Sequence, residues 1–303
     1  MFAAQAKPQA PAPARKWVVL PFLWKGVKRL CMGLGVMVLV FSIYVTVIVA
    51  QFDGVAPEPL PDEMVMYIKF QGDLPEVQEV GGFTDPFALA EPTIRDVIGA
   101  LDKASVDPRV KGIYARLDGE GFSMAHIQEL RDAIKRFKDS GKFAYIYAQS
   151  YNGFGGYYLA SVFDEIWMQP MGIVSIPGLN LKSPYLRNVI YKIGENPQFF
   201  QRKEYKTAYE NLTNGEMSPQ SREMMDDLLA DIKAEFMKDI PAERGFSSAD
   251  FEDYVDLGLI TASDALDAKL ITRSEYADIL VDKITEKVSG EPEFDEEIFV
   301  DLK

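Results

Sequence analysis

The sequence contains very few of the residues from which many catalytic and structural sites are built. It has one cysteine, Cys31, and one histidine, His126. A single cysteine excludes a disulfide framework within the chain and a cysteine-rich zinc site. A single histidine argues against a His-rich metal centre and against a Ser-His-Asp triad. We therefore expect no metal or cofactor, and any nucleophilic catalysis needs a serine or threonine activated by another base.

Acidic residues are absent from the first 50 positions. This segment holds six basic residues, which are Lys7, Arg15, Lys16, Lys25, Lys28 and Arg29. Because the 32 basic residues of the chain include these six, residues 51–303 carry 26 basic residues against all 46 acidic ones. Such an acidic body repels a nucleic-acid backbone, so we expect no nucleic-acid partner.

Residues 31–50 (CMGLGVMVLVFSIYVTVIVA) contain no charged residue at all. A helix of this length, at about 1.5 Å per residue, spans roughly 30 Å, the thickness of a bilayer core. A cleaved signal peptide usually has a shorter apolar region nearer the N-terminus, and a core helix of a soluble protein shows a more polar face. We predict one transmembrane signal anchor at residues 31–50, with membrane lipid as a partner.

The basic residues also predict an orientation. All six precede the predicted anchor, and no Lys or Arg follows it until Lys69. By the positive-inside rule, residues 1–30 form a basic cytoplasmic tail and the acidic body lies across the membrane. Residues 51–62 contain three prolines and predict a linker between the anchor and the body.

Strand and helix patterns alternate in the first part of the body. Ser or Thr caps predict helices after Thr93 and Ser123, and a Gly-rich turn at 152–156 precedes a short helix predicted at 157–162. The predicted strands lie at 64–70, 110–117, 143–148 and 165–168. Alternation at these intervals predicts an α/β fold with parallel strands and right-handed crossovers.

The second part of the body is predicted to be richer in helix. We predict a strand at 198–202 and a long amphipathic helix that starts at Ser218-Pro219. Residues 289–303 begin as an acidic linker and end in a strand pattern at 298–302. We interpret this last pattern as the start of a missing second half.

Two features of the body could carry chemistry. Lys206 lies between Tyr205 and Tyr209, shortly after the strand predicted at 198–202. A lysine serves as a general base when buried, apolar surroundings favour its neutral form, whereas most lysines are solvated surface residues. The Gly-rich turn at 152–156 could bind an oxyanion at a helix N-terminus or let a helix pack closely on a sheet. Gly119 and Gly121 allow the same two interpretations.

Five segments together resemble a known family, signal peptide peptidase A, also called protease IV. They are VKGIYARL at 110–117, FGGYYLAS at 154–161, DEIWMQPMG at 164–172, EYKTAYEN at 204–211 and MSPQSRE at 217–223. The resemblance implies a ClpP/crotonase-like fold of repeated β-β-α units over residues 63–288, here as the N-terminal half of the long duplicated form. It further implies a bacterial inner-membrane location with a periplasmic domain, signal-peptide substrates, a homo-oligomer and a Ser-Lys dyad. Lys206 matches the lysine of that dyad.

The sequence departs from the family at the nucleophile. Short members of the family carry an alanine-serine-glycine-glycine turn, but here residues 153–156 read Gly-Phe-Gly-Gly, so Phe154 stands at the serine position. The resemblance therefore predicts a chain that supplies the base while a second half or a partner supplies the serine. A catalytically inactive scaffold or peptide-binding subunit is the alternative. A crotonase-type acyl-CoA enzyme shares the fold but does not suit a domain outside the cytoplasm.

Overall fold

The computed structural model of the chain describes residues 19–52, 60–72, 74–77, 92–119, 121–290 and 298–301. The chain divides into two compact units, residues 1–59 and residues 60–303. The first unit contains the predicted anchor, and the second contains the whole of the predicted α/β domain. Most of the predicted linker lies outside the described residues.

The first unit is built around one long helix, α1 (Val19–Phe52). It begins well before the predicted span at 31–50, so residues 19–30 of the predicted tail are helical. Pro21 is compatible with this early start, because its missing N–H breaks no helical hydrogen bond in the first turn. The segment Trp24–Ile48 is long and apolar enough to cross a membrane. This apolar helix is consistent with a membrane-anchored protein.

The second unit contains a six-stranded sheet in which every neighbouring pair is parallel. Its strand order is β8-β5-β3-β2-β1-β9. The strands are β1 (Met64–Phe70), β2 (Val110–Leu117), β3 (Phe143–Ala148), β5 (Glu165–Met168), β8 (Arg273–Ser274) and β9 (Phe299–Asp301). The first four are the strands that the sequence predicts, with the same bounds. The predicted α/β architecture with parallel strands is thus confirmed.

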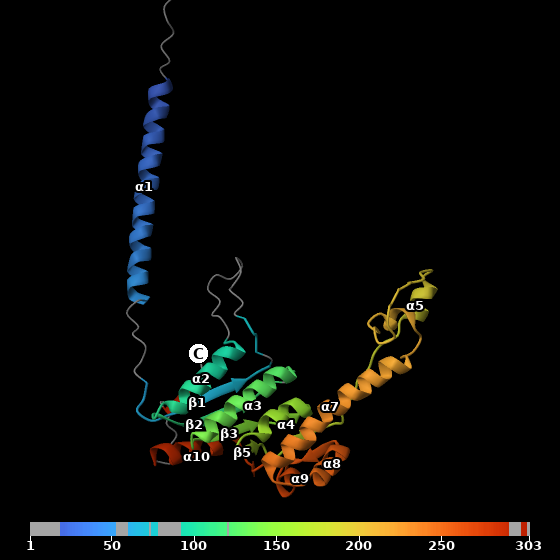
Figure 1. The fold of residues 1–303 in the computed structure, drawn as a ribbon. Helices are drawn as coiled ribbons and strands as arrows, with labels where there is room; N and C mark the ends of the chain where they lie inside the picture. The colour runs from blue at the N-terminus through green and yellow to red at the C-terminus, as the bar shows by residue number, and fades with distance from the viewer. Residues whose placement is uncertain are drawn as a thin grey trace, which may run out of the picture. The chain divides into compact units, whose positions relative to one another are not determined.

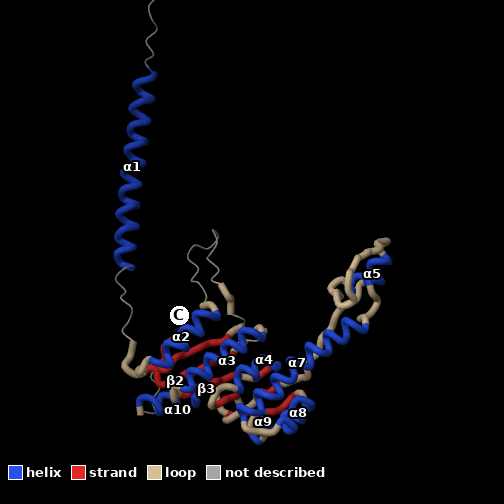
Figure 2. The backbone as a smooth tube through the Cα atoms, in the orientation of Figure 1, coloured by secondary structure: helices blue, strands red, loops and turns tan. Residues whose placement is uncertain are grey.

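One face of this sheet is covered by α2 (Ile94–Val106), α3 (Met124–Asp139) and α4 (Gly153–Ser161) (Figures 1 and 2). The predicted caps are present, since the side chains of Thr93 and Ser123 accept hydrogen bonds from the third residue of α2 and α3. The apolar stripe of α3 is fully buried against the sheet, which makes this helix a rigid part of the domain. Its residues are Ile127, Leu130, Ala133, Ile134 and Phe137.

The opposite face is covered by α10 (Ala277–Ser289), which buries Leu280 and Ile284 against an aromatic surface of the sheet. That surface is formed by Tyr114, Tyr145, Tyr147 and Trp167. Lys283 of α10 adds an ion pair, with Nζ 2.6 Å from a carboxylate oxygen of Glu165 in β5. The sheet is therefore buried on both faces, as parallel sheets generally are.

A smaller sheet and a second group of helices follow α4. The small sheet has the order β4-β6-β7, formed by β4 (Tyr151–Asn152), β6 (Ile173–Ser175) and β7 (Leu259–Thr261). The helices are α5 (Arg187–Lys192), α6 (Glu210–Thr213), α7 (Pro219–Arg244), α8 (Ser248–Leu257) and α9 (Ala262–Asp267). We call residues 177–218, which include α5 and α6, the arm. Figure 1 shows α5 beyond the end of α7 that is remote from α8 and α9.

The structure differs from the sequence prediction within the arm. Residues 198–202 form no strand. Phe199 instead stacks on Tyr209 at 4.9 Å, and the side chain of Phe200 is 97% exposed. A strand needs neighbouring backbone to satisfy its N–H and C=O groups, and the arm offers no described strand to pair with. The predicted strand is wrong for this reason.

The strand predicted at 298–302 is confirmed as β9 at the edge of the main sheet. β9 pairs in parallel with β1, with Val65 opposite Phe299 and Tyr67 opposite Asp301. It therefore extends the main sheet of this domain beyond β1. Residues 291–297 of the predicted acidic linker lie outside the described residues.

The ends of β1 and β2 approach so closely that Gly119 has no room for a side chain. A Cβ at this position would lie 1.9 Å from the backbone oxygen of Gln71. We expect Gly119→Ala to lower the free energy of unfolding by about 2 kcal/mol or more, since backbone must move to relieve the overlap. Denaturant titration of the chain in detergent measures this loss.

Gly99→Ala in α2 is the matched control, because apart from the adjoining helix backbone and the two chain neighbours no atom lies within 4 Å of the place that a Cβ would take there. Alanine in place of a helical glycine should raise the free energy of unfolding by about 0.5–1 kcal/mol. Equal stability of the Gly119→Ala variant and the unchanged protein would contradict the close approach.

Candidate active site

The Gly-rich segment at 152–156 is the first turn of a helix. α4 starts at Gly153, whereas the sequence predicts a turn followed by a helix at 157–162. The helix forms despite its three glycines because it packs between α3 and α7, and tertiary packing overrides propensity. Gly155 permits this packing, since a Cβ there would lie 2.9 Å from Cδ1 of Ile127 in α3. Close helix packing is therefore a sufficient reason for this glycine.

Phe154, which the sequence resemblance aligns with a serine, points into the apolar contact between α4 and α7. Its ring stacks on Phe236 with centroids 4.8 Å apart and an interplanar angle of 18°, and its side chain is 9% exposed. A cleft of about 300 Å³ opens beside it, with Leu229, Met237 and Val255 among the lining residues. Residue 154 thus provides packing at the position where the resemblance predicts the nucleophile of the short members of the family.

The serines Ser123, Ser150 and Ser161 each have a structural role. Ser123 caps α3, with Oγ 3.2 Å from the backbone nitrogen of His126. Ser150 Oγ accepts a hydrogen bond of 3.2 Å from the backbone nitrogen of Ile173. Ser161 is buried and accepts a hydrogen bond of 2.7 Å from Nη1 of Arg131. These contacts explain the three hydroxyl groups without a catalytic function.

Lys206 lies in the arm, in an exposed segment that is neither helix nor strand. The phenol of the neighbouring Tyr205 donates a hydrogen bond of 2.8 Å to Oε2 of Glu223, which connects this segment to α7. The buried, apolar surroundings in which an amine acts as a base are not provided around Lys206 by the described residues of this chain. A second surface would have to supply them.

The structure does not bring Lys206 and Phe154 together. Tyr205 contacts α7 at Glu223, whereas Phe154 contacts α7 at Phe236. Between these two residues the helix advances about 20 Å, at about 1.5 Å per residue. The candidate base and the position that would hold the nucleophile therefore belong to two separate surfaces of the domain.

The Gly119 turn lies beside a second, polar cleft of about 360 Å³ at the carboxyl ends of the central strands. Its lining residues are Arg116, Leu117, Asp118, Gly119, Gln149, Ser150, Asn152 and Gln169. Arg116 Nε donates a hydrogen bond of 2.8 Å to Asp118 Oδ1, so the charges at the mouth of this cleft are paired. The close approach of Gln71 explains Gly119 as a tight strand-to-helix connection.

Sequence reasoning missed one group at this site, the buried guanidinium of Arg131 in α3. Its side chain contacts both α4 and α7. The signal for it is visible in the sequence, because Arg131 interrupts the apolar stripe of Ile127, Leu130 and Ile134. A charged residue on the buried side of a helix needs a specific partner.

The packing of Phe154 gives a testable expectation. Phe154→Ser should lower the free energy of unfolding by about 3 kcal/mol, because a buried aromatic ring is lost from the α4–α7 contact. Phe154→Leu, which keeps an apolar side chain, should cost clearly less. Denaturant titration followed by near-UV circular dichroism measures both, and equal losses would contradict this account of the position.

Comparison with known proteins places this geometry in a family. The model of Peptidase family S49 matches residues 136–290, just over half of the chain. The chain is 29% identical to "Serine protease SPPA, chloroplastic" of Arabidopsis thaliana over 62% of its own length and 28% of that protein. It is 32% identical to "Protease 4" of Haemophilus influenzae over 49% of its length and 24% of that protein.

A third relative, "Protease 4" of Salmonella typhi, is 29% identical over 60% of this chain and 31% of that protein. The aligned part of the chain thus spans 24% to 31% of the length of these curated relatives. The family match also confirms the ClpP/crotonase-like α/β fold that the sequence motifs imply. The chain belongs to peptidase family S49, the family of signal peptide peptidase A to which its motifs point.

Proposed function

We propose that this chain is part of a membrane-anchored serine peptidase with a Ser-Lys dyad, in which it supplies the general base Lys206. The nucleophilic serine comes from a second half or from a partner. The observation that carries the proposal is the separation within the domain, with an exposed lysine in the arm and Phe154 packed at the serine position. Membership of family S49 supports the reaction class.

The chemistry follows from this division. When a serine-bearing surface covers the arm, the contact removes water from around Lys206 and favours the neutral amine. The amine then takes the proton of the serine hydroxyl as the hydroxyl attacks a peptide carbonyl. The resulting ammonium returns the proton to the leaving amine, and hydrolysis of the acyl-serine completes the cycle.

The same proposal assigns the remaining parts of the chain. The apolar helix α1 anchors the protein in a bacterial inner membrane, with the basic N-terminal segment in the cytoplasm and residues 60–303 in the periplasm. Cleaved signal peptides, which also enter the membrane, are the substrates. A dyad shared between surfaces requires assembly, and a homo-oligomer whose subunits each combine this domain with a serine-bearing second half or partner provides it.

Replacement of Lys206 tests the proposal. In the complete membrane assembly, purified through a tag on this chain, Lys206→Ala should reduce kcat for peptide cleavage by about 10³-fold or more, since the dyad loses its base. Lys203→Ala, a change to another exposed lysine of the same loop, is the control and should leave kcat unchanged. Unchanged turnover in Lys206→Ala would reject the proposal.

The alternative is a catalytically inactive subunit that binds peptides or serves as a scaffold. The apolar cleft beside Phe154 favours peptide binding as the second candidate. On this alternative, a serine-reactive phosphonate labels no serine in a native complex that contains this chain. A labelled serine whose reactivity depends on Lys206 would decide for the dyad.

A further inference from the structure

The arm that carries Lys206 is supported by one long helix. α7 has 26 residues, and its C-terminal half is fastened to the domain through the buried residues Phe236 and Ile240. Its N-terminal end holds the arm, where Tyr205 bonds to Glu223 of α7. Ser218, the N-cap of α7, donates a hydrogen bond of 2.6 Å from Oγ to Glu210 Oε1 within the arm. Between these ends most side chains of residues 222–234 are exposed or half-buried. The angle of α7 therefore sets where the arm lies.

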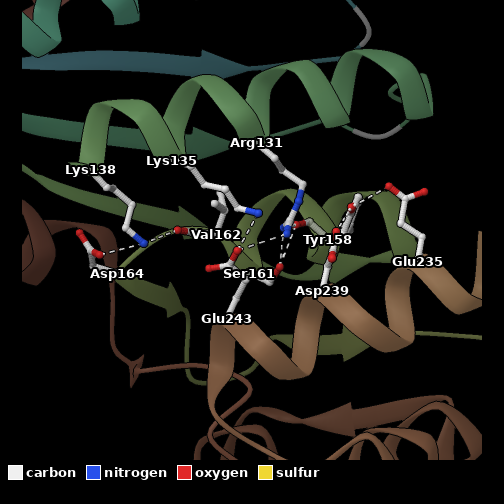
Figure 3. Close-up of polar contacts among 10 residues, drawn as sticks. All are labelled: Arg131, Lys135, Lys138, Tyr158, Ser161, Val162, Asp164, Glu235, Asp239 and Glu243. Carbon is white, nitrogen blue, oxygen red and sulfur yellow. Dashed lines mark hydrogen bonds and ion pairs between the residues drawn. The ribbon is translucent and has the colours of Figure 1, made fainter. Parts of the chain in front are cut away.

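Three carboxylates lie on the side of α7 that faces α3 and α4. Glu235, Asp239 and Glu243 recur every four residues, so they share one face of the helix. Figure 3 shows all three pointing towards α3 and α4. We call these carboxylates, together with Gln128, Arg131, Lys135, Tyr158 and Ser161, the α7 latch.

Arg131 is the centre of the latch. Its side chain is almost completely buried (residue exposure 1%), and its guanidinium lies over the ring of Tyr158 at 3.8 Å. Nη1 donates hydrogen bonds to the carbonyl oxygen of Tyr158 and to Ser161 Oγ, both in α4 (Figure 3). Nη2 lies 3.8 Å from Oε1 of Glu243 in α7. One cation of α3 thus contacts the ends of two other helices.

Tyr158 provides the second contact between α4 and α7. Its hydroxyl donates a hydrogen bond of 2.7 Å to Asp239 Oδ2 and lies 3.3 Å from Glu235 Oε1. Burial and the hydrogen bond to Asp239 raise the pKa of Tyr158 above its usual range, so the phenol keeps its proton and donates at neutral pH. α3 adds two contacts, from Gln128 Nε2 to Glu235 at 2.5 Å and from Lys135 Nζ to Glu243 at 2.9 Å.

Stability alone is a poor explanation for this arrangement. A buried ion pair contributes little net stability, because desolvation offsets the attraction. Nη2 of Arg131 makes no hydrogen bond to any described residue, so the guanidinium is not even fully satisfied. Directional hydrogen bonds between fixed helices instead favour one geometry over its neighbours, whereas the apolar contact of Phe236 tolerates small rotations.

We propose that the α7 latch is the positioning element for Lys206, with Arg131 and Tyr158 as positioning residues that fix the angle of α7. This inference rests on the proposed function of Lys206. From Glu235 to Ser218 the helix extends about 26 Å, so a rotation of about 5° at the latch moves the arm by about 2 Å. A displacement of about 1 Å in an active site lowers the rate of an enzyme by up to about 100-fold. A change in the angle of α7 at the latch should therefore lower the rate of peptide cleavage.

Distance measurements on this chain test the latch directly. One spin label is placed on the domain by Val106→Cys and one on the arm by Ile193→Cys, at residues that are 81% and 71% exposed. Cys31→Ser removes the native thiol. Tyr158→Phe with Glu243→Gln removes latch contacts while keeping side-chain size. We expect the interspin distance distribution of this variant to broaden or shift by about 2 Å or more, which is the displacement of the arm for a rotation of about 5° at the latch.

The matched control combines Asp102→Asn with Glu252→Gln. These changes break two exposed ion pairs, one between α2 and α3 and one between α7 and α8. The control should keep the distance distribution of the unchanged protein. An unchanged distribution in a folded latch variant, or the same broadening in the control, would overturn the proposal. If the latch variant does not fold, Tyr158→Phe alone is measured against the same criteria.

Kinetics of the complete assembly connect the latch to Lys206. We expect the latch variant to lower kcat about 10-fold or more with KM changed less than about twofold, because substrate contacts remain while the base is misplaced. An unchanged kcat would overturn the inference. The proposed function has its own test, because it is rejected if Lys206→Ala retains activity. The spin-label distances do not depend on that result.

Discussion

The packing of α4 between α3 and α7 is the constraint on which the rest of the structure depends. Gly155 lets α4 approach α3, and Phe154 stacks on Phe236 of α7. These contacts join the sheet, the helical layer and α7, and α7 in turn holds the arm. Phe154, which the resemblance aligns with the family's nucleophile, is thus part of the framework that supports the candidate base.

This arrangement is compatible with the proposal that the domain supplies one half of a dyad. A catalytic serine at position 154 would need a free, exposed hydroxyl, whereas the structure places a largely buried ring there. Lys206 lies on the arm, away from that position and open to another surface. The α7 latch fixes the angle of α7 relative to α3 and α4 more narrowly than the apolar packing does. Hydrogen bonds depend on direction more strongly than dispersion contacts.

Much of the fold is predictable from the sequence. The bounds of β1, β2, β3 and β5 follow from short apolar runs, and the starts of α2, α3 and α7 follow from Thr93, Ser123 and Ser218-Pro219. The start of α4 is not predictable from local pattern, since a helix with three glycines forms only through packing. The predicted strand at 198–202 fails because a short local sequence pattern does not provide a pairing partner.

The site was only partly predictable. Family motifs single out Lys206 as the candidate base and residue 154 as the candidate serine position, and both assignments stay predictions. The stacking of Phe154 on Phe236 depends on residues far apart in the sequence. Mass spectrometric mapping of a fluorophosphonate adduct, in the native membrane complex containing this chain, tests the central claim most directly. The account predicts a modified serine outside residues 60–303 of this chain, and no modification when Lys206 is replaced by alanine. A modified serine within residues 60–303 would contradict it.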